Sequence, residues 1–405
     1  MLFSISWRNI WRNKLRSAVI ITAITLGLVA GIFAAALFKG MGDQRVEKVI
    51  KTELSHIQIH QPEFRQANEI SNYISEANHL ADEIRKNPNV KGVSERILIF
   101  SMIASAETAA GVKISGIDPE NEKLVSDLNS KLIEGNYFEE QRRYPVILGR
   151  KLAEKLNVKL GSKVIITLQD MENNITAGAY RIVGIYDTKN NLFDEANVFI
   201  RDRDLRNLIN LPEDACHEIA ILVDDNENVP LVQKSIRTDH NDLETMSWLE
   251  LSPEMSYLNE AMDLMMYIFI VIILFALLFG ILNTMLMVVL ERVKEIGMLM
   301  AIGMNKLRIF MMIVLETVML SLTGGVFGIL FGSLITKYFE THKIDLTVWG
   351  EAYSDVGYDP YAHTTLHPDL LVNITLMVII TGILASLYPA YKALKNDPAD
   401  ALRTE

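Results

Sequence analysis

His56 and His60 are spaced so that they could bind a metal ion together. They lie in HIQIH, a candidate strand at 56–60, in which residues an even number apart point to the same face. Imidazole pairs hold Zn²⁺ when a third or fourth ligand joins them. The sequence offers no third ligand for this pair, so we expect no metal site.

Motifs for nucleotide hydrolysis and for covalent catalysis are missing from the chain. LGSK at 160–163 has the last part of a G-x-x-x-x-G-K-[ST] phosphate loop but lacks its first glycine. HEIAI at 217–221 is not H-E-x-x-H, and no G-x-S-x-G occurs. Asp118 and Asp187 stand beside candidate strands without an identifiable catalytic partner. We therefore predict that the chain is not an enzyme and binds no cofactor itself.

Glu316 is the one charged residue in the apolar stretch 309–336. A carboxyl group inside a membrane is costly unless it pairs or reaches water. It could belong to a proton or substrate path, or it could hydrogen-bond a neighbouring helix near the membrane surface. No second charge accompanies it within the apolar stretches, so we favour the structural interpretation.

Long apolar stretches must position these groups. Each is long enough to cross a bilayer as a helix, and they cover residues 17–38, 264–290, 309–336 and 370–391. We predict four transmembrane helices, TM1 to TM4. The first stretch exceeds the usual length of a signal peptide's apolar region, so we expect TM1 to be retained rather than cleaved.

Lysine and arginine beside the spans predict the orientation, because they accumulate on the cytoplasmic side. They are concentrated in residues 1–16, which have the pattern of an amphipathic helix, in the loop 291–308 and in the tail 392–405. These segments, with both termini, are predicted to be cytoplasmic, whereas 39–263 and the loop 337–369 lie outside. The net charge of −11 comes from the outer segment, so we expect no nucleic-acid partner.

The outer segment 39–263 has a mixed pattern of short strands and helices. Helical patterns at its two ends continue TM1 and TM2 and predict a stalk. Cys216 is the only cysteine, so no intrachain disulfide can form. A division into two lobes near residues 100 and 205 is a further hypothesis. The candidate strands are 56–60, 96–103, 111–117, 163–168, 180–186, 197–201 and 218–223, and the candidate helices are 70–86, 120–131, 150–157, 202–209 and 229–237. The predicted fold class is an α+β membrane protein, with four transmembrane helices and a large mixed α/β extracytoplasmic domain between the first and second.

Glycines recur every four residues in two of the predicted spans. Gly27 and Gly31 lie in TM1, and Gly324, Gly328 and Gly332 lie in TM3. Small residues at this spacing let two helix backbones approach closely. We expect these faces to pack against other helices, either of the same chain or of a second one.

The loop 291–308 is half charged and half apolar. Its apolar residues fall on one side of a helix, while charged residues crowd its first turns. We expect a short helix at the membrane surface that offers a face to a partner. The residues on which this interpretation depends are Glu291, Arg292, Glu295, Ile296, Gly297, Leu299, Ile302 and Gly303.

The ordered set of motifs resembles the FtsX/MacB-like ABC transporter permeases. The resemblance rests on WRNIWRNKLRS, GNYFEEQRRYPVILGRKLAEKLNVKLGSKVIITL, YRIVGIYDT, ERVKEIGMLMAIGMNKLRIFMMIVLE, LSLTGGVFGILFG and YPAYKALKNDPADALR. It covers nearly the whole chain in order. It implies that two permease chains, alike or different, pair in the bacterial inner membrane above a separate ATPase dimer that binds ATP and Mg. The loop after TM2 would dock on that ATPase as a coupling helix, and the stalks would transmit its motion outward.

Within this family the chain resembles the lipoprotein-releasing branch, because it has a long outer domain and no ATPase domain of its own. The resemblance implies membrane lipids as surroundings, a lipoprotein or other exported substrate, and a periplasmic carrier. The hairpin QDMENNITAGAY at 169–180 is short, however, and we identify no hook that would recruit a carrier. An efflux permease of a tripartite system is the alternative. A membrane-anchored sensor or scaffold, and a membrane-anchored enzyme, are the alternatives from other classes.

Overall fold

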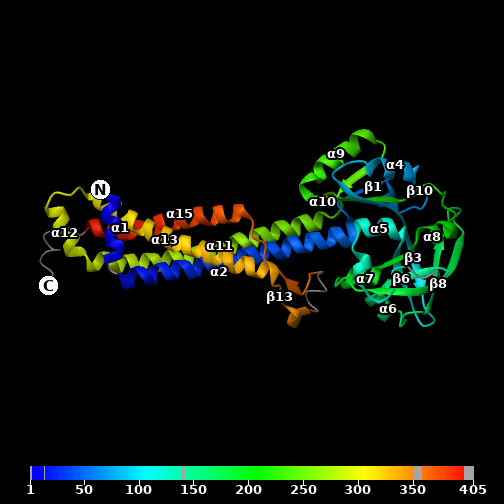
Figure 1. The fold of residues 1–405 in the computed structure, drawn as a ribbon, viewed down its shortest axis with the longest axis horizontal. Helices are drawn as coiled ribbons and strands as arrows, with labels where there is room; N and C mark the ends of the chain where they lie inside the picture. Colours follow the sequence, from blue (N-terminus) through cyan, green and yellow to red (C-terminus); the bar gives the residue numbers. More distant parts are fainter. Residues whose placement is uncertain (1, 13, 139–142, 351–357, 396–405) are drawn as a thin grey trace. The chain divides into compact units, whose positions relative to one another are not determined.

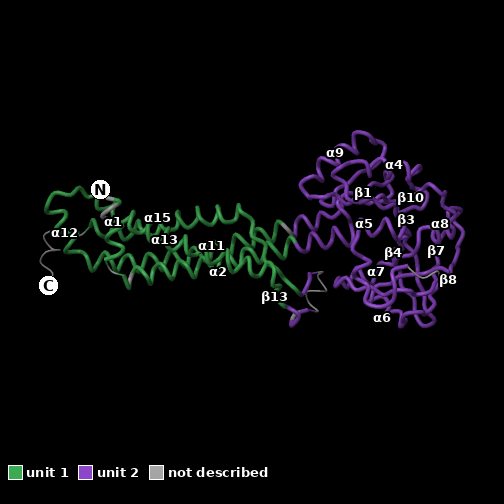
Figure 2. Tube along the Cα trace, viewed as in Figure 1, with its two compact units in different colours: residues 1–43, 259–345, 361–405 green, residues 44–258, 346–360 purple. Residues whose placement is uncertain are grey.

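The computed structural model describes residues 2–12, 14–138, 143–350 and 358–395. The chain forms two compact units (Figure 2). We call residues 1–43, 259–345 and 361–405 the membrane bundle, and residues 44–258 and 346–360 the inserted domain.

The membrane bundle consists of long helices that lie side by side (Figure 1). Within the described residues, four helices are long and apolar enough to cross a membrane, as predicted. One of them, α11, begins at Pro253, directly after Ser252, as its sequence indicates. The bundle's helices are α1 (Leu2–Arg12), α2 (Lys14–Val49), α11 (Pro253–Glu291), α12 (Val293–Ala301), α13 (Lys306–Thr341) and α15 (Pro368–Lys395), and α2 and α11 also extend into the inserted domain.

The glycines of α13 pack against α2 of the same chain. A Cβ atom on Gly328 would lie 2.6 Å from the Cβ atom of Leu28, closer than real side chains come. Thr25 donates a hydrogen bond of 3.2 Å to the carbonyl oxygen of Gly324. The equivalent close pairs are Gly324 with Ile24 and Gly332 with Ile32. The sequence left the partner of this face open, and the structure places it within the chain.

The glycines of α2 face another helix, α11. A Cβ atom on Gly27 would lie 2.8 Å from the side chain of Leu277, and one on Gly31 would lie 3.6 Å from Ile273. The first contact is too close for a side chain, and the second is an ordinary van der Waals distance. Thus α2 packs with one face on α13 and with another on α11.

The inserted domain is built on one mixed sheet of ten strands, in the order β12-β1-β11-β3-β4-β9-β6-β8-β5, with β7 paired to β3 and β8. Its strands are β1 (Ile57–His60), β3 (Val90–Ala104), β4 (Ala109–Ile117), β5 (Leu132–Gly135), β6 (Pro145–Gly149), β7 (Lys163–Gln169), β8 (Ile175–Tyr186), β9 (Asn197–Arg201), β11 (Glu218–Val223) and β12 (Glu244–Ser247). A separate two-stranded sheet joins β2 (Ile74–Ser75) and β10 (Ala215–Cys216). The sheet's helices are α3 (Phe64–Ala67), α4 (Ala77–Ile84), α5 (Pro119–Val125), α6 (Arg150–Lys155), α7 (Asn191–Ala196), α8 (Asp202–Ile209), α9 (Val229–Asp239) and α10 (Trp248–Leu251).

All seven strands predicted from the sequence are present, but others were missed. The strand β6 has no alternation, because all five of its residues are buried between β8 and β9. The helix predicted over 70–86 is wrong in its first half. Residues 74–75 form β2 instead, and α4 begins only at Ala77.

The lobes predicted in the outer segment share one sheet. Of the two largest hydrophobic cores of the inserted domain, one uses residues 57–93 and 216–236, and the other uses residues 97–215. The strand β3 is 15 residues long and contributes to both cores. The boundaries therefore fall near residues 95 and 216 rather than near 100 and 205, and the continuous sheet joins the two parts.

Candidate functional site: the loop between the second and third membrane helices

The loop begins with a sharp break in the helix. The second membrane helix, α11, ends at Glu291, and Arg292 has a non-helical backbone before α12 starts at Val293. Glu295 therefore lies in the first turn of α12, where a negative charge suits the positive end of the helix dipole. Glu291 is instead the last residue of α11.

Arg292 connects this loop to the buried carboxylate of the third membrane helix. Its Nη1 lies 3.3 Å from Oε1 of Glu316, and its Nε donates a hydrogen bond of 2.9 Å to Oε2 of Glu295. The side chains of Arg292 and Glu316 are 17% and 8% exposed. Glu316 thus has the structural partner that we favoured, but this partner is an arginine outside the apolar stretches.

The ion pairs continue to the N-terminal helix. Arg12, the last residue of α1, binds Oε1 of Glu295. The chain of charges Arg12–Glu295–Arg292–Glu316, which we call the charge relay, joins α1, α12 and α13. Hydrogen bonds from Arg292 and Arg12 lower the pKa of Glu295 below its ordinary value, so this carboxyl is ionised at neutral pH. Glu295 is thus bound by two arginines of its own chain.

A small polar cavity adjoins the charge relay. It has a volume of about 20 Å³ and is lined by Asn9, Arg12, Ser17, Arg292 and Glu316, together with apolar residues of α2, α11 and α13. A cavity of this size holds about one water molecule. The buried ion pair can therefore be hydrated at its edge, which lowers the cost of keeping two charges out of bulk water.

The helix α1 lies against α13 and presents aromatic residues outward. Ser6 donates a hydrogen bond of 3.3 Å to the carbonyl oxygen of Met312, and Ile10 is buried in the core of the bundle. Trp7 and Trp11 are half-exposed and touch edge to face. This is the arrangement expected of an amphipathic helix that lies at a membrane surface.

The apolar stripe of α12 is divided between the bundle and solvent. Ile296 and Gly297 are buried, and Leu299 packs on the bundle's core. Ile302 is 78% exposed. The prediction that one open apolar face includes all these residues is therefore wrong. The bundle's own apolar surface covers the first part of the stripe. The exposed apolar residues of the loop are Met298, Ile302 and Leu307, which we call the docking patch.

Gly303 ends α12 in a way that only glycine allows without strain. Its φ is +95°, in the left-handed region. The N–H groups of Gly303 and Met304 donate to the carbonyl oxygens of Met300 and Leu299, which is the Schellman pattern of a helix end. Asn305 then caps α13 by accepting a hydrogen bond from the N–H of Leu307. These residues fix where Ile302 and Leu307 lie on the loop.

The two histidines whose spacing could suit a metal ion, His56 and His60, have separate partners. Nδ1 of His56 accepts a hydrogen bond of 3.0 Å from the N–H of Val223. The ring of His60 instead contacts the carbonyl oxygen of His217 and Oε1 of Gln58, each at 3.1 Å. Within the described residues, no group of three or more histidine, cysteine or acidic side chains could hold a metal ion.

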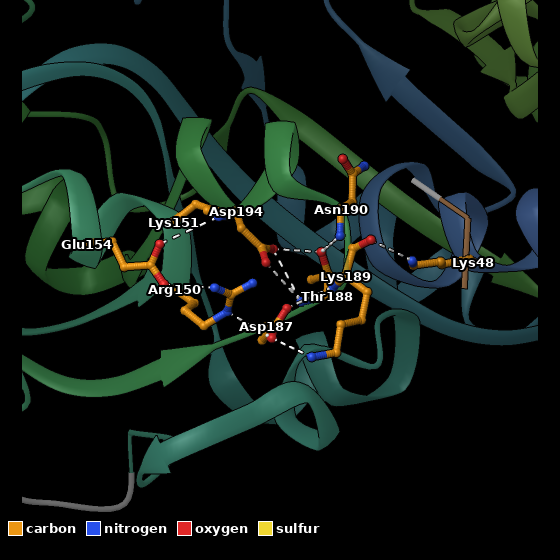
Figure 3. A network of polar contacts seen from close by, with 9 residues as sticks. All are labelled: Lys48, Arg150, Lys151, Glu154, Asp187, Thr188, Lys189, Asn190 and Asp194. Carbon is orange, nitrogen blue, oxygen red and sulfur yellow. Dashed lines mark hydrogen bonds and ion pairs between the residues drawn. The ribbon is translucent and has the colours of Figure 1, made fainter. Parts of the chain in front are cut away.

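A second polar network lies in the inserted domain, around the turn that precedes α7 (Figure 3). Asp194 is fully buried and accepts hydrogen bonds from the N–H and the hydroxyl of Thr188. Burial raises the pKa of Asp194 to about 7. Asp187 pairs with Arg150 at 3.0 Å and with Lys189 at 2.6 Å, and their hydrogen bonds hold its pKa at about 2. Asp187, for which the sequence showed no catalytic partner, thus has Arg150 and Lys189 as structural partners.

The buried Asp194 predicts a specific dependence of stability on pH. Between about pH 4 and pH 7 the folded carboxyl keeps a proton that the unfolded one releases, so the free energy of unfolding falls as pH rises. We expect Asp194→Asn to remove this fall, on the order of 2–4 kcal/mol, in denaturant unfolding of the full chain followed by tryptophan fluorescence. Asp242→Asn, at an exposed position, is the control and should keep the fall. An unchanged pH profile in Asp194→Asn would contradict this explanation.

Comparisons with known proteins agree with this architecture. Residues 267–398 match the FtsX-like permease C-terminal family, and residues 17–239 match the MacB-like periplasmic core domain. The chain is 23% identical over 421 residues to an uncharacterized ABC transporter permease of Methanocaldococcus jannaschii, covering 100% of this chain and 98% of the relative.

Two further relatives are transmembrane proteins of lipoprotein-releasing systems. LolE of Haemophilus influenzae is 20% identical, covering 99% of this chain and 98% of its own. LolC of Neisseria meningitidis is 24% identical, covering 96% and 94%. The four membrane helices and the mixed α/β domain inserted after the first are the parts that the two family models describe. The chain therefore belongs to the FtsX/MacB-like family of ABC transporter permeases.

Proposed function

We propose that this chain is the membrane subunit of an ABC transporter whose ATPase is a separate protein. The ATPase dimer, which binds ATP and Mg, docks on the loop between α11 and α13. This loop and both termini then lie in the cytoplasm, and the inserted domain lies outside the inner membrane. A second permease chain completes the complex.

The observation that carries this proposal is the construction of the loop. Its docking patch exposes three apolar side chains, two at the end of α12 and one at the start of α13, which suits insertion into a groove of a partner. The charge relay ties the same short helix to α1 and to the interior of α13. A force applied at Ile302 is therefore opposed by the buried ion pair of Arg292 and Glu316. It moves the helices of the bundle instead of bending a flexible loop.

For the cargo, we propose proteins or other molecules anchored by lipid in the outer leaflet. Support comes from the full-length relatives that are named for lipoprotein release. The connection between β7 and β8 is a tight turn at residues 170–174, closed by hydrogen bonds to the carboxylate of Asp170. This turn offers no extended hook, so we do not propose that this hairpin recruits a carrier.

Ile302→Glu should prevent the ATPase from docking. A carboxylate in place of the most exposed apolar side chain of the patch would have to be buried unpaired in the partner's groove. We expect at least tenfold less ATPase to co-purify with the full chain in detergent than with the unmodified chain. Leu231→Glu makes the same change at an exposed position of the inserted domain and should have no effect. Equal co-purification of both variants would refute the docking patch.

A further inference from the structure

The first membrane helix changes its winding where it enters the inserted domain. The α-helix α2 runs to Val49, and residues Ile50–Leu54 then form a single π-helical segment. Ser55 ends it with a φ of +60° and donates its N–H to the carbonyl oxygen of Ile50 at 2.7 Å. Segments of π-helix are uncommon and occur often at functional positions. Here the wider turn determines which side chains of the helix end face the domain.

Two side chains of this helix end bind the turn that precedes α7. Oε1 of Glu53 accepts a hydrogen bond of 2.7 Å from Nδ2 of Asn190. Nζ of Lys48 donates one of 3.2 Å to the carbonyl oxygen of Lys189 (Figure 3). Lys48 thus binds the backbone carbonyl of Lys189, and Glu53 binds the side-chain amide of the next residue in the turn, Asn190. On another side, Thr52 donates to Asp127 at 3.2 Å.

The turn is held in place independently of the helix. Asp187 is fixed by Arg150 and Lys189, and Thr188 is fixed by the buried Asp194 (Figure 3). Asn190 caps α7, since its Oδ1 accepts a hydrogen bond from the N–H of Phe193. Because its oxygen is used in the cap, its amide nitrogen is directed to Glu53. The hydrogen bond to the helix is therefore a consequence of how the turn is built.

Apolar residues close the same junction from the other side. Ile50 is buried together with Val125, Leu222 and Trp248. Met255, in the first turn of α11, packs on this cluster. Both helices that lead to the membrane bundle thus end on one small core, while Glu53 gives α2 a separate polar attachment to the turn.

We propose that Glu53 and Asn190 are positioning residues of a joint that stays closed during transport and carries the movement of α2 into the inserted domain through residues 187–194. This inference rests on the proposed function. The joint supplies what transmission needs, because a hydrogen bond of 2.7 Å is short and directional and both of its ends are fixed. Without it, the helix end would keep the apolar cluster and the hydrogen bonds of Lys48 and Thr52, but it would lose its attachment to the cap of α7.

The test is a set of variants that break and then reverse this hydrogen bond. Asn190→Asp keeps the cap of α7, since a carboxylate accepts the N–H of Phe193 equally well, but it places two carboxylates together. Glu53→Gln keeps an oxygen that accepts from Asn190. In the double variant Glu53→Gln with Asn190→Asp, the new amide donates to the new carboxylate, so the bond is restored in the opposite direction.

Movement is measured by pulsed electron paramagnetic resonance in the complete complex with its ATPase, with ADP and with trapped ATP. One label pair, at Val19 and Leu290, lies in the membrane bundle. A second pair joins Leu231 of the inserted domain to Tyr338 of the membrane bundle and reports on movement of one unit against the other. All four positions are exposed. Cys216 is fully buried, so it does not react with the label. ATP hydrolysis is measured in parallel.

We expect ATP to change both distances in the unmodified joint and in Glu53→Gln. In Asn190→Asp the bundle distance should still change and ATP hydrolysis should stay within twofold, but the change at 231–338 should fall to less than half. The double variant should recover the full change of the 231–338 distance. A full change at 231–338 in Asn190→Asp, or no recovery in the double variant, would overturn the joint. No change at either pair with a native joint would instead overturn the transporter function on which it rests.

Discussion

Replacing Arg292 by leucine should destabilise the membrane bundle and uncouple the loop from it. The substitution removes the ion pair between Arg292 and the carboxylate of Glu316, which is buried in α13. Removing one member of a buried pair costs about 3–5 kcal/mol. It also releases Glu295 from one of its two arginines. We expect a clear loss of thermal stability in detergent and no stimulation of the partner ATPase.

Two further variants distinguish the effect of losing a positive charge from the effect of losing the buried ion pair. Arg308→Leu removes a positive charge from the same loop at an exposed position, so it controls for membrane orientation and should be nearly neutral. The double variant Arg292→Leu with Glu316→Leu removes both buried charges, and replacing a pair by apolar residues is often neutral or stabilising. It should recover stability without recovering coupling. Unchanged stability in Arg292→Leu would show that the charge relay does not hold the loop.

Gly328→Ala should separate α13 from α2. The added methyl group would lie 2.6 Å from Cβ of Leu28, an atom near the backbone that cannot rotate away. Overpacking of this kind costs about 1–3 kcal/mol, and in a membrane close packing is the main force between helices. We expect a lower melting temperature of the full chain in detergent micelles.

Gly280 in α11 provides the matched control. A Cβ atom there would have no neighbour within 4 Å, so Gly280→Ala makes the same chemical change in open space. It should be neutral or slightly stabilising, since alanine favours a helix by up to about 1 kcal/mol over glycine. If Gly328→Ala and Gly280→Ala changed the melting temperature equally, the glycine face of α13 would not be a packing surface.

The sequence predicts the membrane helices well because their signal is local. Stretches such as 264–290 are uncharged and long enough to need no tertiary information. The end of α12 is similarly local, since Gly303 and Asn305 carry the backbone geometry that stops one helix and starts the next. Strand β6 was missed for the opposite reason. A short strand buried on both faces has no alternation to distinguish it from a buried helix.

The charge relay could not be predicted, because its members are far apart in the chain. Arg12 and Glu295 are separated by 283 residues, and nothing in the composition of either segment selects the other. The burial of the first part of the apolar stripe of α12 could not be predicted for a related reason. An apolar face at helical spacing is equally suited to a partner or to the chain's own bundle, and only the packing of Ile296 decides between them.

The most direct test is ATP hydrolysis by the purified full chain, alone and with the ATP-binding subunit that co-purifies with it. The chain alone should hydrolyse ATP no faster than a control complex in which the catalytic residue of the ATP-binding subunit is inactivated. Adding the subunit should give turnover that depends on the chain and is lost with Ile302→Glu. Hydrolysis by the chain alone, or a subunit whose rate is unaffected by it, would contradict the assignment of this protein as an ATP-driven permease.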